Sequence, residues 1–214
     1  IRDKFPIVER STNLGIPNLP KELVQAIGGQ SGGAAYVFRS ESGDMSATVA
    51  ADALSIETSA YRSWETYWEL AELCFNNLKA IYNPPFLTRA GLRYQNYIRR
   101  SHVGVGDVPW SALLSDAVLG EMSNATWEGM TTESRRTLRC KDTIGDALLL
   151  QHGIGQIGTT NEQIYVIDFD YYRDERIECN ELATVFERFH NRSGRAFRWA
   201  ISQQLHDNLG PTEL

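Results

Sequence analysis

The sequence lacks most of the patterns from which a function is directly predicted. No run approaches about 18 consecutive apolar residues, so no transmembrane helix is expected. There is no GxSxG nucleophile elbow, no P-loop, no HExxH zinc motif and no Cys–His signature of a thiol nucleophile. The chain therefore carries no recognisable catalytic motif, and no cofactor is expected.

Cysteine is scarce. The three cysteines are Cys74, Cys140 and Cys179, which are far apart and form no CxxC pair. An odd number of cysteines without a disulfide framework is typical of a reducing compartment, so a cytoplasmic location is predicted. A single bridge between two of them is an alternative that the spacing leaves open.

Positive charge is also in deficit. Lysine and arginine total 21 against 27 aspartate and glutamate residues, and the net charge is −6. Such a protein repels nucleic acid and anionic membranes as a whole, so neither is an expected partner without a local basic patch. The hydrophobic and charged contents, 42% and 22%, are those of an ordinary globular protein.

The apolar periodicity predicts an α+β fold. Residues 63–82 and 181–209 have the apolar stripe of long helices, and residues 110–122 predict a shorter helix. Strands are predicted at residues 35–40, 45–58, 87–100, 136–141, 147–153 and 163–172. Because hairpins cluster and helices follow them, we expect a mainly antiparallel sheet of about six strands with both long helices packed on one face.

The first part of the chain differs in character from the rest. Three prolines without periodicity, followed by a glycine-rich stretch, predict that residues 1–33 form an extended N-terminal arm and linker. Residues 34–214 are predicted to form a single α+β domain, with two halves at 34–105 and 135–214 as an alternative. The chain begins at Ile1 without a methionine, so we expect a longer gene product.

The predicted strand at residues 87–100 has the densest set of unusual polar side chains. A period of two places Arg89, Arg93, Gln95, Tyr97 and Arg99 on one face, opposite the apolar side chains of the same strand. Guanidinium groups bind oxyanions well, so this face is a candidate site for a phosphate or a carboxylate. The structural interpretation, which we favour, is a solvated sheet face or ion pairing with acidic residues.

Asp168 and Asp170 are the acidic residues best placed for either role. They lie two apart on a predicted strand and therefore share a face. Paired carboxylates can hold a divalent metal or divide acid–base work. No third carboxylate or histidine follows at ligand spacing, so we favour an exposed face or pairing with an arginine of a neighbouring strand.

Residues 153–158 match the letters of the GxGxxG dinucleotide-binding motif. That motif needs its glycines to open a helix whose N-terminus binds a pyrophosphate. Here the next segment is predicted to be a strand, so we interpret the glycines as a flexible hairpin loop.

Four segments, distributed in order over nearly the whole chain, resemble one family. They are FP-x-VE at residues 5–9, GLRY-x-N at 91–96, IDFD at 167–170 and LGP at 209–211. The chain resembles a sporadically distributed, uncharacterised family of bacterial proteins. The resemblance implies a bacterial cytosolic protein, further residues before Phe5, and Arg93 and Asn96 as positions of interest. With Asn96, the candidate ligand-binding residues are Arg89, Arg93, Gln95, Asn96 and Arg99.

The leading hypothesis is a non-enzymatic protein-interaction or accessory module, for example of a bacterial defence or toxin–antitoxin type of system. Its partner would be another protein, one encoded nearby being an option, and a homo-oligomer is compatible with the sequence. A metal-dependent hydrolase or phosphodiesterase that uses Asp168 and Asp170 is the competing hypothesis. A sensor of a phosphate-bearing ligand on the Arg93 strand is the third.

Overall fold

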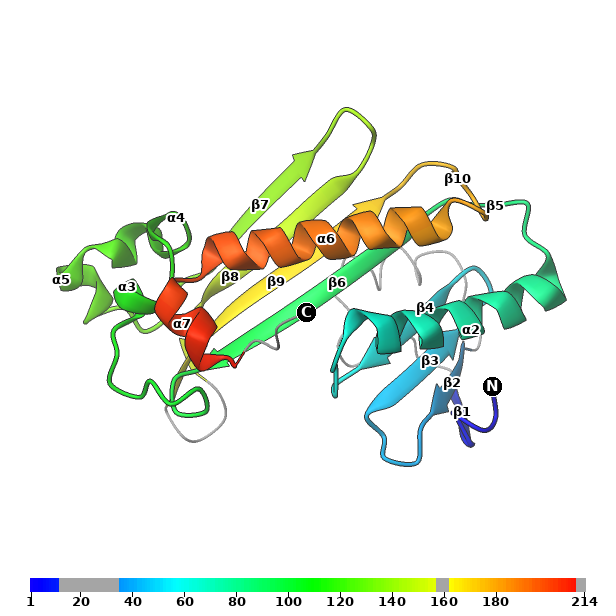
Figure 1. Ribbon diagram of the computed structural model, residues 1–214, viewed down its shortest axis with the longest axis horizontal. Helices are drawn as coiled ribbons and strands as arrows, with labels where there is room; N and C mark the ends of the chain where they lie inside the picture. Colours follow the sequence, from blue (N-terminus) through cyan, green and yellow to red (C-terminus); the bar gives the residue numbers. More distant parts are fainter. Residues whose placement is uncertain (12–34, 157–161, 211–214) are drawn as a thin grey trace. The chain divides into compact units, whose positions relative to one another are not determined.

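The computed structural model describes residues 1–11, 35–156 and 162–210 (Figure 1). The chain divides into two compact units, Ile1–Pro84 and Pro85–Leu214, and each is described here by itself. Both are α+β with antiparallel strands, which confirms the predicted fold class.

The first unit contains a four-stranded antiparallel sheet in the order β1-β2-β3-β4. Its strands are β1 (Ile7–Ser11), β2 (Ala35–Arg39), β3 (Met45–Val49) and β4 (Leu54–Thr58). The single strand predicted at 45–58 is therefore two strands. They are joined by a tight turn in which the Ala50 N–H donates to the Ala53 carbonyl at 2.9 Å.

Helix α2 (Trp64–Tyr82) packs on this sheet through Leu70 and Cys74, which join Phe5 and Ala47 in a small core. The helix begins and ends as its sequence predicts. The Ser63 side chain accepts a hydrogen bond from the Thr66 N–H, and left-handed Asn83 ends the helix before a proline.

The expected N-terminal arm is only partly described. Residues Ile7–Ser11 pair with β2 as strand β1, and Phe5 is fully buried, so this part of the arm belongs to the first sheet. The rest of the arm and the predicted glycine linker, residues 12–34, lie outside the described residues.

The second unit is built on another four-stranded antiparallel sheet, in the order β6-β9-β8-β7. Its strands are β6 (Ala90–Arg99), β7 (Arg136–Lys141), β8 (Ala147–Gln156) and β9 (Gln163–Arg173). A small separate sheet pairs β5 (Phe86–Leu87) with β10 (Ile177–Glu178). The predicted strand at 87–100 is thus interrupted near Arg89.

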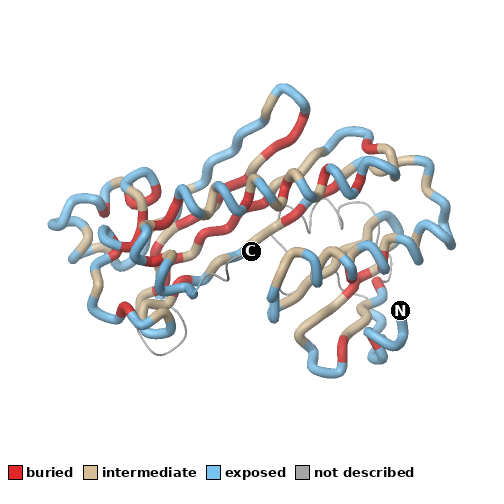
Figure 2. Tube along the Cα trace, viewed as in Figure 1, coloured by how far each residue is buried: buried red, intermediate tan, exposed pale blue. Residues whose placement is uncertain are grey.

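Helix α6 (Leu182–Ala200) lies along β6 and β9 on one face of the larger sheet, and the β7–β8 hairpin extends beyond it (Figure 1). Phe189 is fully buried and stacks on Tyr171 of β9, with ring centroids 6.3 Å apart. The core between helices and sheet is red in Figure 2, whereas β7 is exposed along nearly its whole length.

Two predicted helices are broken in the structure. Residues 110–122 form α3 (Trp110–Leu113), α4 (Asp116–Leu119) and the 3-10 turn η1 (Gly120–Ser123), because the Ser115 N–H donates to the Ala200 carbonyl. Residues 181–209 form α6 and α7 (Gln203–Asn208), because the Ser202 N–H donates to the Leu113 carbonyl. The polar connection after residue 122 includes α5 (Ala125–Glu128).

Other details of the predicted fold are also wrong. The described residues hold ten strands in three sheets rather than about six in one. The two 19-residue helices do not share a sheet face, since α2 packs on the first sheet and α6 on the larger sheet of the second unit. None of the described helices has both the length and the apolar character that crossing a membrane requires.

The described part of the GxGxxG segment, residues 153–156, is strand rather than the flexible hairpin loop that we expected. Gly153 and Gly155 belong to β8, while residues 157 and 158 lie outside the described residues. A Cβ atom at Gly153 would lie 1.8 Å from the Ser134 carbonyl oxygen, so the glycine permits a close backbone approach. The segment that follows is strand β9, as predicted.

Candidate functional site

The arginine strand pairs directly with the strand of Asp168 and Asp170. In the β6–β9 register Arg93 lies opposite Asp170, and Gln95 lies opposite Asp168. Arg93 reaches diagonally to Asp168, with Nε 2.8 Å from Oδ1 and Nη2 on Oδ2. This bidentate pair is the ion pairing across an antiparallel sheet that the sequence analysis favoured for Arg93.

Asp170 is the more unusual of the two carboxylates. Its nearest described arginine contact is Arg89 Nη2, at 3.7 Å, and it is 6% exposed. Burial raises the pKa of Asp170 to about 6, while Arg89 and Arg93 act in the opposite direction. Arg89 also bonds to Asp174 and lies over the Tyr172 ring.

The remaining candidate residues are spread over both faces of β6. Gln95 donates to Asp168 at 3.4 Å, and exposed Tyr97 and half-buried Arg99 follow it along the strand. Asn96 is on the helix-facing side, where it donates to the Ile167 carbonyl at 3.1 Å. Arg89, Arg93 and Gln95 therefore converge on the two aspartates, whereas Asn96 and Arg99 make no contact with those carboxylates in the described residues.

The carboxylates of this face are held by arginines rather than presented to a cation. Within residues 1–11, 35–156 and 162–210, no group of three or more His, Cys, Asp or Glu side chains is arranged to hold a metal ion. A cation that used Asp168 would have to displace Arg93 from both carboxylate oxygens.

A second charged cluster, which the sequence analysis missed, lies at the start of β8. Asp146 has a side-chain exposure of 0% and binds three arginines: Arg173 Nε at 2.9 Å, Arg188 Nε at 2.7 Å and Arg192 Nη1 at 3.2 Å. Arg192 also bonds to Asp142 at 2.7 Å. Three guanidinium groups against two carboxylates leave one excess positive charge at this point of an acidic protein.

Local geometry positions both carboxylates of this cluster. Gly145, at φ 89°, closes the β7–β8 turn that separates them. The Asp142 side chain accepts the N–H groups of Ile144 and Asp146. Although burial acts to raise the pKa of Asp142, the Arg192 and backbone hydrogen bonds prevail and lower it.

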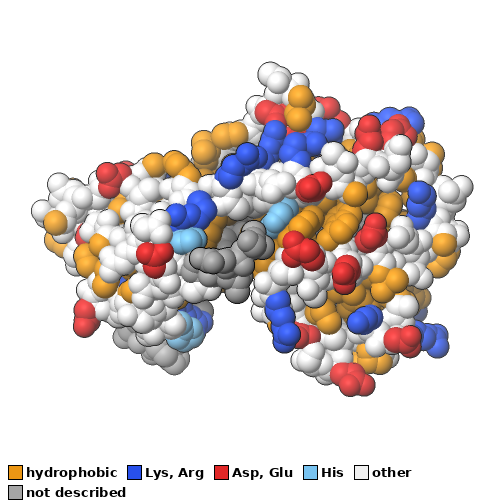
Figure 3. Space-filling view, viewed as in Figure 1, with side chains coloured by type: hydrophobic (Ala, Val, Ile, Leu, Met, Phe, Trp, Pro, Cys, Tyr) orange, Lys and Arg blue, Asp and Glu red, His pale blue; other side chains and the backbone are white. Residues whose placement is uncertain are grey.

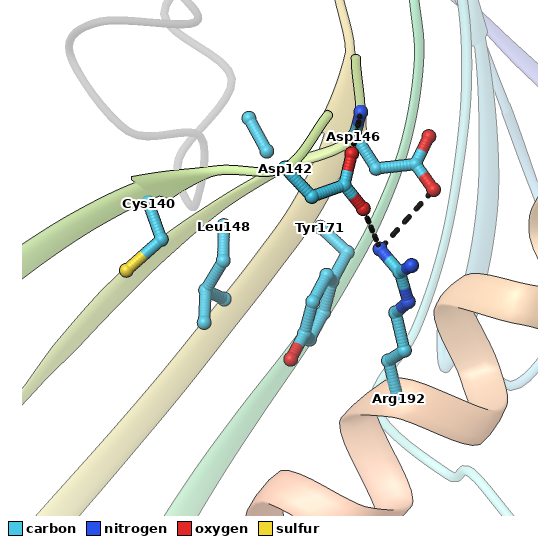
Figure 4. Close-up of a pocket in the computed structure, with 7 residues that line it drawn as sticks. Cys140, Asp142, Asp146, Leu148, Tyr171 and Arg192 are labelled. Atoms are coloured by element: carbon cyan, nitrogen blue, oxygen red, sulfur yellow. Dashed lines mark hydrogen bonds and ion pairs between the residues drawn. The ribbon is translucent and has the colours of Figure 1, made fainter. Parts of the chain in front are cut away.

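A cavity of about 280 Å³ opens beside this cluster (Figure 4). Leu148 and Tyr171 form its floor, Cys140 of β7 lies on one side, and Arg192 of α6 lies on the other. Blue side chains gather between α6 and the β7–β8 hairpin in the space-filling view (Figure 3). We call the apolar floor between α6 and β7, formed by Cys140, Leu148 and Tyr171 and bordered by Leu138 on the same face of β7, the α6–β7 groove.

The groove exists because α6 does not cover the whole sheet. The cross-strand pairs Leu138–Leu150, Cys140–Leu148 and Leu148–Tyr171 place these residues on the face that α6 covers farther along. Leu138 is nevertheless 49% exposed, and every residue of β7 after Arg136 is exposed. In the described part of the chain β7 pairs with β8 alone, so its outer edge is open.

One signal for the missed cluster is present in the sequence. Arg188, Arg192 and Arg195 recur at four and three residues, so they share one face of the predicted helix. Their partner Asp146 is 42 and 46 positions away from Arg188 and Arg192, a distance over which helical periodicity carries no information.

In comparisons with known proteins, no family model, no curated protein and no solved structure matches the chain. The family resemblance drawn from the four short segments stays a prediction.

Proposed function

We propose that this chain is a non-enzymatic module that binds another protein, and that the partner docks on the α6–β7 groove. The observation that carries the proposal is the uncovered β7 edge, where exposed Leu138 borders an apolar floor beside the Arg192 cluster. An apolar centre with a charged rim is the usual composition of a protein-binding surface. We place the module in the bacterial cytoplasm, in an accessory system of the defence or toxin–antitoxin type.

The state of the ionisable groups supports binding over catalysis. Asp146 is enclosed by three arginines, and Asp168 is held bidentately by Arg93. Guanidinium groups therefore occupy the carboxylate oxygens that a substrate or a metal ion would have to reach. The pairs of Arg188 and Arg192 with Asp146 hold the β7–β8 hairpin against α6. The Arg93–Asp168 pair links β6 to β9.

The direct test is assembly with the products of genes that flank the gene for this chain. Each product is mixed with the purified chain and examined by size-exclusion chromatography, with two variants beside the wild type. Leu138→Asp puts a charge in the groove, and Ile81→Asp puts one on an exposed apolar residue of α2, which is 75% exposed. A complex with the wild type and with Ile81→Asp, but not with Leu138→Asp, supports the proposal; a lone monomer with every product contradicts it.

One observation favours a second candidate function, the metal-dependent hydrolase or phosphodiesterase. Asp170 has a pKa of about 6, which suits a proton-transfer role near neutral pH. This alternative requires a divalent ion to raise the melting temperature and Asp168→Ala to remove that effect. Identical melting curves with and without Mg²⁺ or Mn²⁺ would count against it.

A further inference from the structure

The backbone of β7 presents its free hydrogen-bonding groups in a defined order. The Asp142 N–H donates to the Asp146 carbonyl at 2.8 Å, and the Ser134 N–H donates to the Ile154 carbonyl at 3.0 Å. Because hydrogen-bonded pairs alternate along an antiparallel ladder, the even-numbered residues between them bond to β8. The odd-numbered residues turn their N–H and C=O groups toward the open edge; they are Thr137, Arg139 and Lys141.

The side chains of β7 also alternate, so the two faces of this edge strand differ in character. Leu138 and Cys140 point into the α6–β7 groove, next to the cavity of about 280 Å³. Arg139 and Lys141 lie on the opposite face, where Lys141 pairs with Glu175 at 2.8 Å. No described contact neutralises Arg139 within residues 1–11, 35–156 and 162–210.

This charge pattern selects against a second copy of the chain. Strands at sheet edges commonly carry lysine or arginine because like charges disfavour pairing between identical edges. Two β7 strands that paired antiparallel would bring the Arg139 side chains of the two copies onto the same face of the combined sheet, where like charges repel. An acidic strand meets the same residues with complementary charge.

We infer that the partner contributes an extended segment with alternating acidic and apolar residues, which adds to the open edge of β7 as a further strand. This inference rests on the proposed function and names the partner segment for the same groove. The apolar side chains of the segment lie beside Leu138 and Cys140 on the groove floor, and its carboxylates lie beside Arg139. Main-chain hydrogen bonds to the three odd-numbered residues supply the register, as in other cases of strand addition.

The test uses synthetic peptides with the full chain and fluorescence anisotropy. The probe is a labelled hexapeptide of alternating glutamate and valine or leucine, and the control replaces every glutamate with lysine. Two further probes carry N-methyl groups on one or the other alternate set of amides, which blocks hydrogen bonding on one edge of the strand. The protein is used as wild type, Arg139→Glu and Arg62→Glu; the last changes an exposed arginine of the first unit by the same charge.

We expect the acidic peptide to bind and the basic peptide not to bind. The peptide that is N-methylated on one alternate set of amides should not bind, and the peptide methylated on the other set should bind as the unmethylated peptide does. The reason is that only one edge of the peptide faces β7. Arg139→Glu should weaken binding by about tenfold, which corresponds to about 1.4 kcal/mol, and Arg62→Glu should leave it unchanged.

Three results would overturn the inference. They are equal binding of the acidic and basic peptides, equal binding of both N-methylated peptides, and no binding of any peptide at millimolar concentration. If a complex with a flanking gene product still depends on Leu138 in any of these cases, the groove binds a protein by another mode and the proposed function stands. If neither the peptides nor the gene products bind, both proposals fail.

Discussion

Removing the charge of Asp146 is the perturbation with the most clearly defined consequence. Asp146→Asn keeps the size of the side chain but leaves the guanidinium groups of Arg173, Arg188 and Arg192 around a neutral amide. In the native protein the Asp146 side chain is fully buried, and the three arginine side chains are 16%, 27% and 28% exposed. The variant therefore loses the anion but keeps the cations that were arranged around it.

The magnitude follows from how far those arginines can recover hydration. Removing one partner of a buried ion pair destabilises a protein by about 3–5 kcal/mol. Because all three guanidinium groups retain some contact with water, we place the loss at about 3 kcal/mol, the lower end of that range. In a chain of this size such a loss lowers the melting temperature by about 6–12 °C.

Urea unfolding followed by circular dichroism measures the loss directly, with Glu175→Gln as the matched control. Glu175 also forms an ion pair at the β7–β8 hairpin, with Lys141, but its side chain is 52% exposed. Removing that charge should cost less than about 1 kcal/mol. If Asp146→Asn cost no more than Glu175→Gln, the three arginines would be solvated independently of Asp146, and the reasoning would be refuted.

Three further predictions concern the β6–β9 face and the glycines of β8. Arg93→Met should destabilise the protein by about 3 kcal/mol by leaving Asp168 buried without its bidentate partner, and adding Asp168→Leu should restore most of the loss in urea unfolding. Since the pKa of Asp170 is raised to about 6 from 3.8, its contribution to stability is fully present below pH 3.8 and is lost as the pH rises through 6. Between pH 4.5 and 7.5 the wild type should therefore lose about 2 kcal/mol more than Asp170→Asn; parallel pH profiles would show that Asp170 titrates normally. Gly153→Ala should cost about 1–3 kcal/mol, because the new Cβ would collide with a backbone carbonyl oxygen, whereas Gly155→Ala has nothing within 4 Å and should be near neutral.

The parts of the fold that the sequence predicts well are those determined by neighbouring residues. Helix α2 begins after Ser63 and ends at Asn83 because a side-chain cap and a proline act within a few positions. Strand β7 has the predicted bounds, since Gly145 and Asp142 specify the turn that follows it. The odd-numbered residues of β6 from Arg93 to Arg99 share a face for the same local reason, the period of two.

The parts that were missed depend on contacts between distant segments. The predicted helices at 110–122 and 181–209 break because the backbone of Ser115 bonds to Ala200 and that of Ser202 bonds to Leu113. The apolar periodicity of one segment cannot predict a hydrogen bond to the other segment. The candidate site shows the same difference. Ion pairing of Arg93 with an acidic residue of a neighbouring strand was one of two structural interpretations open from the strand pattern, and the structure shows Asp168 as the partner. Asp146, in contrast, gains two of its three arginines from α6, which no local pattern connects to it.

The position of β6 in its sheet has a consequence for synthesis of the protein. Within the described residues its ladder forms with β9 alone, and Arg93 and Asp168 are 75 residues apart in the chain. The ribosome makes β6 first, at about 5–20 residues per second, so several seconds pass before β9, its partner in the described residues, has been made. Because like charges disfavour pairing between identical strands, we expect Arg93 and Arg99 to oppose association of two nascent copies through β6 during this interval.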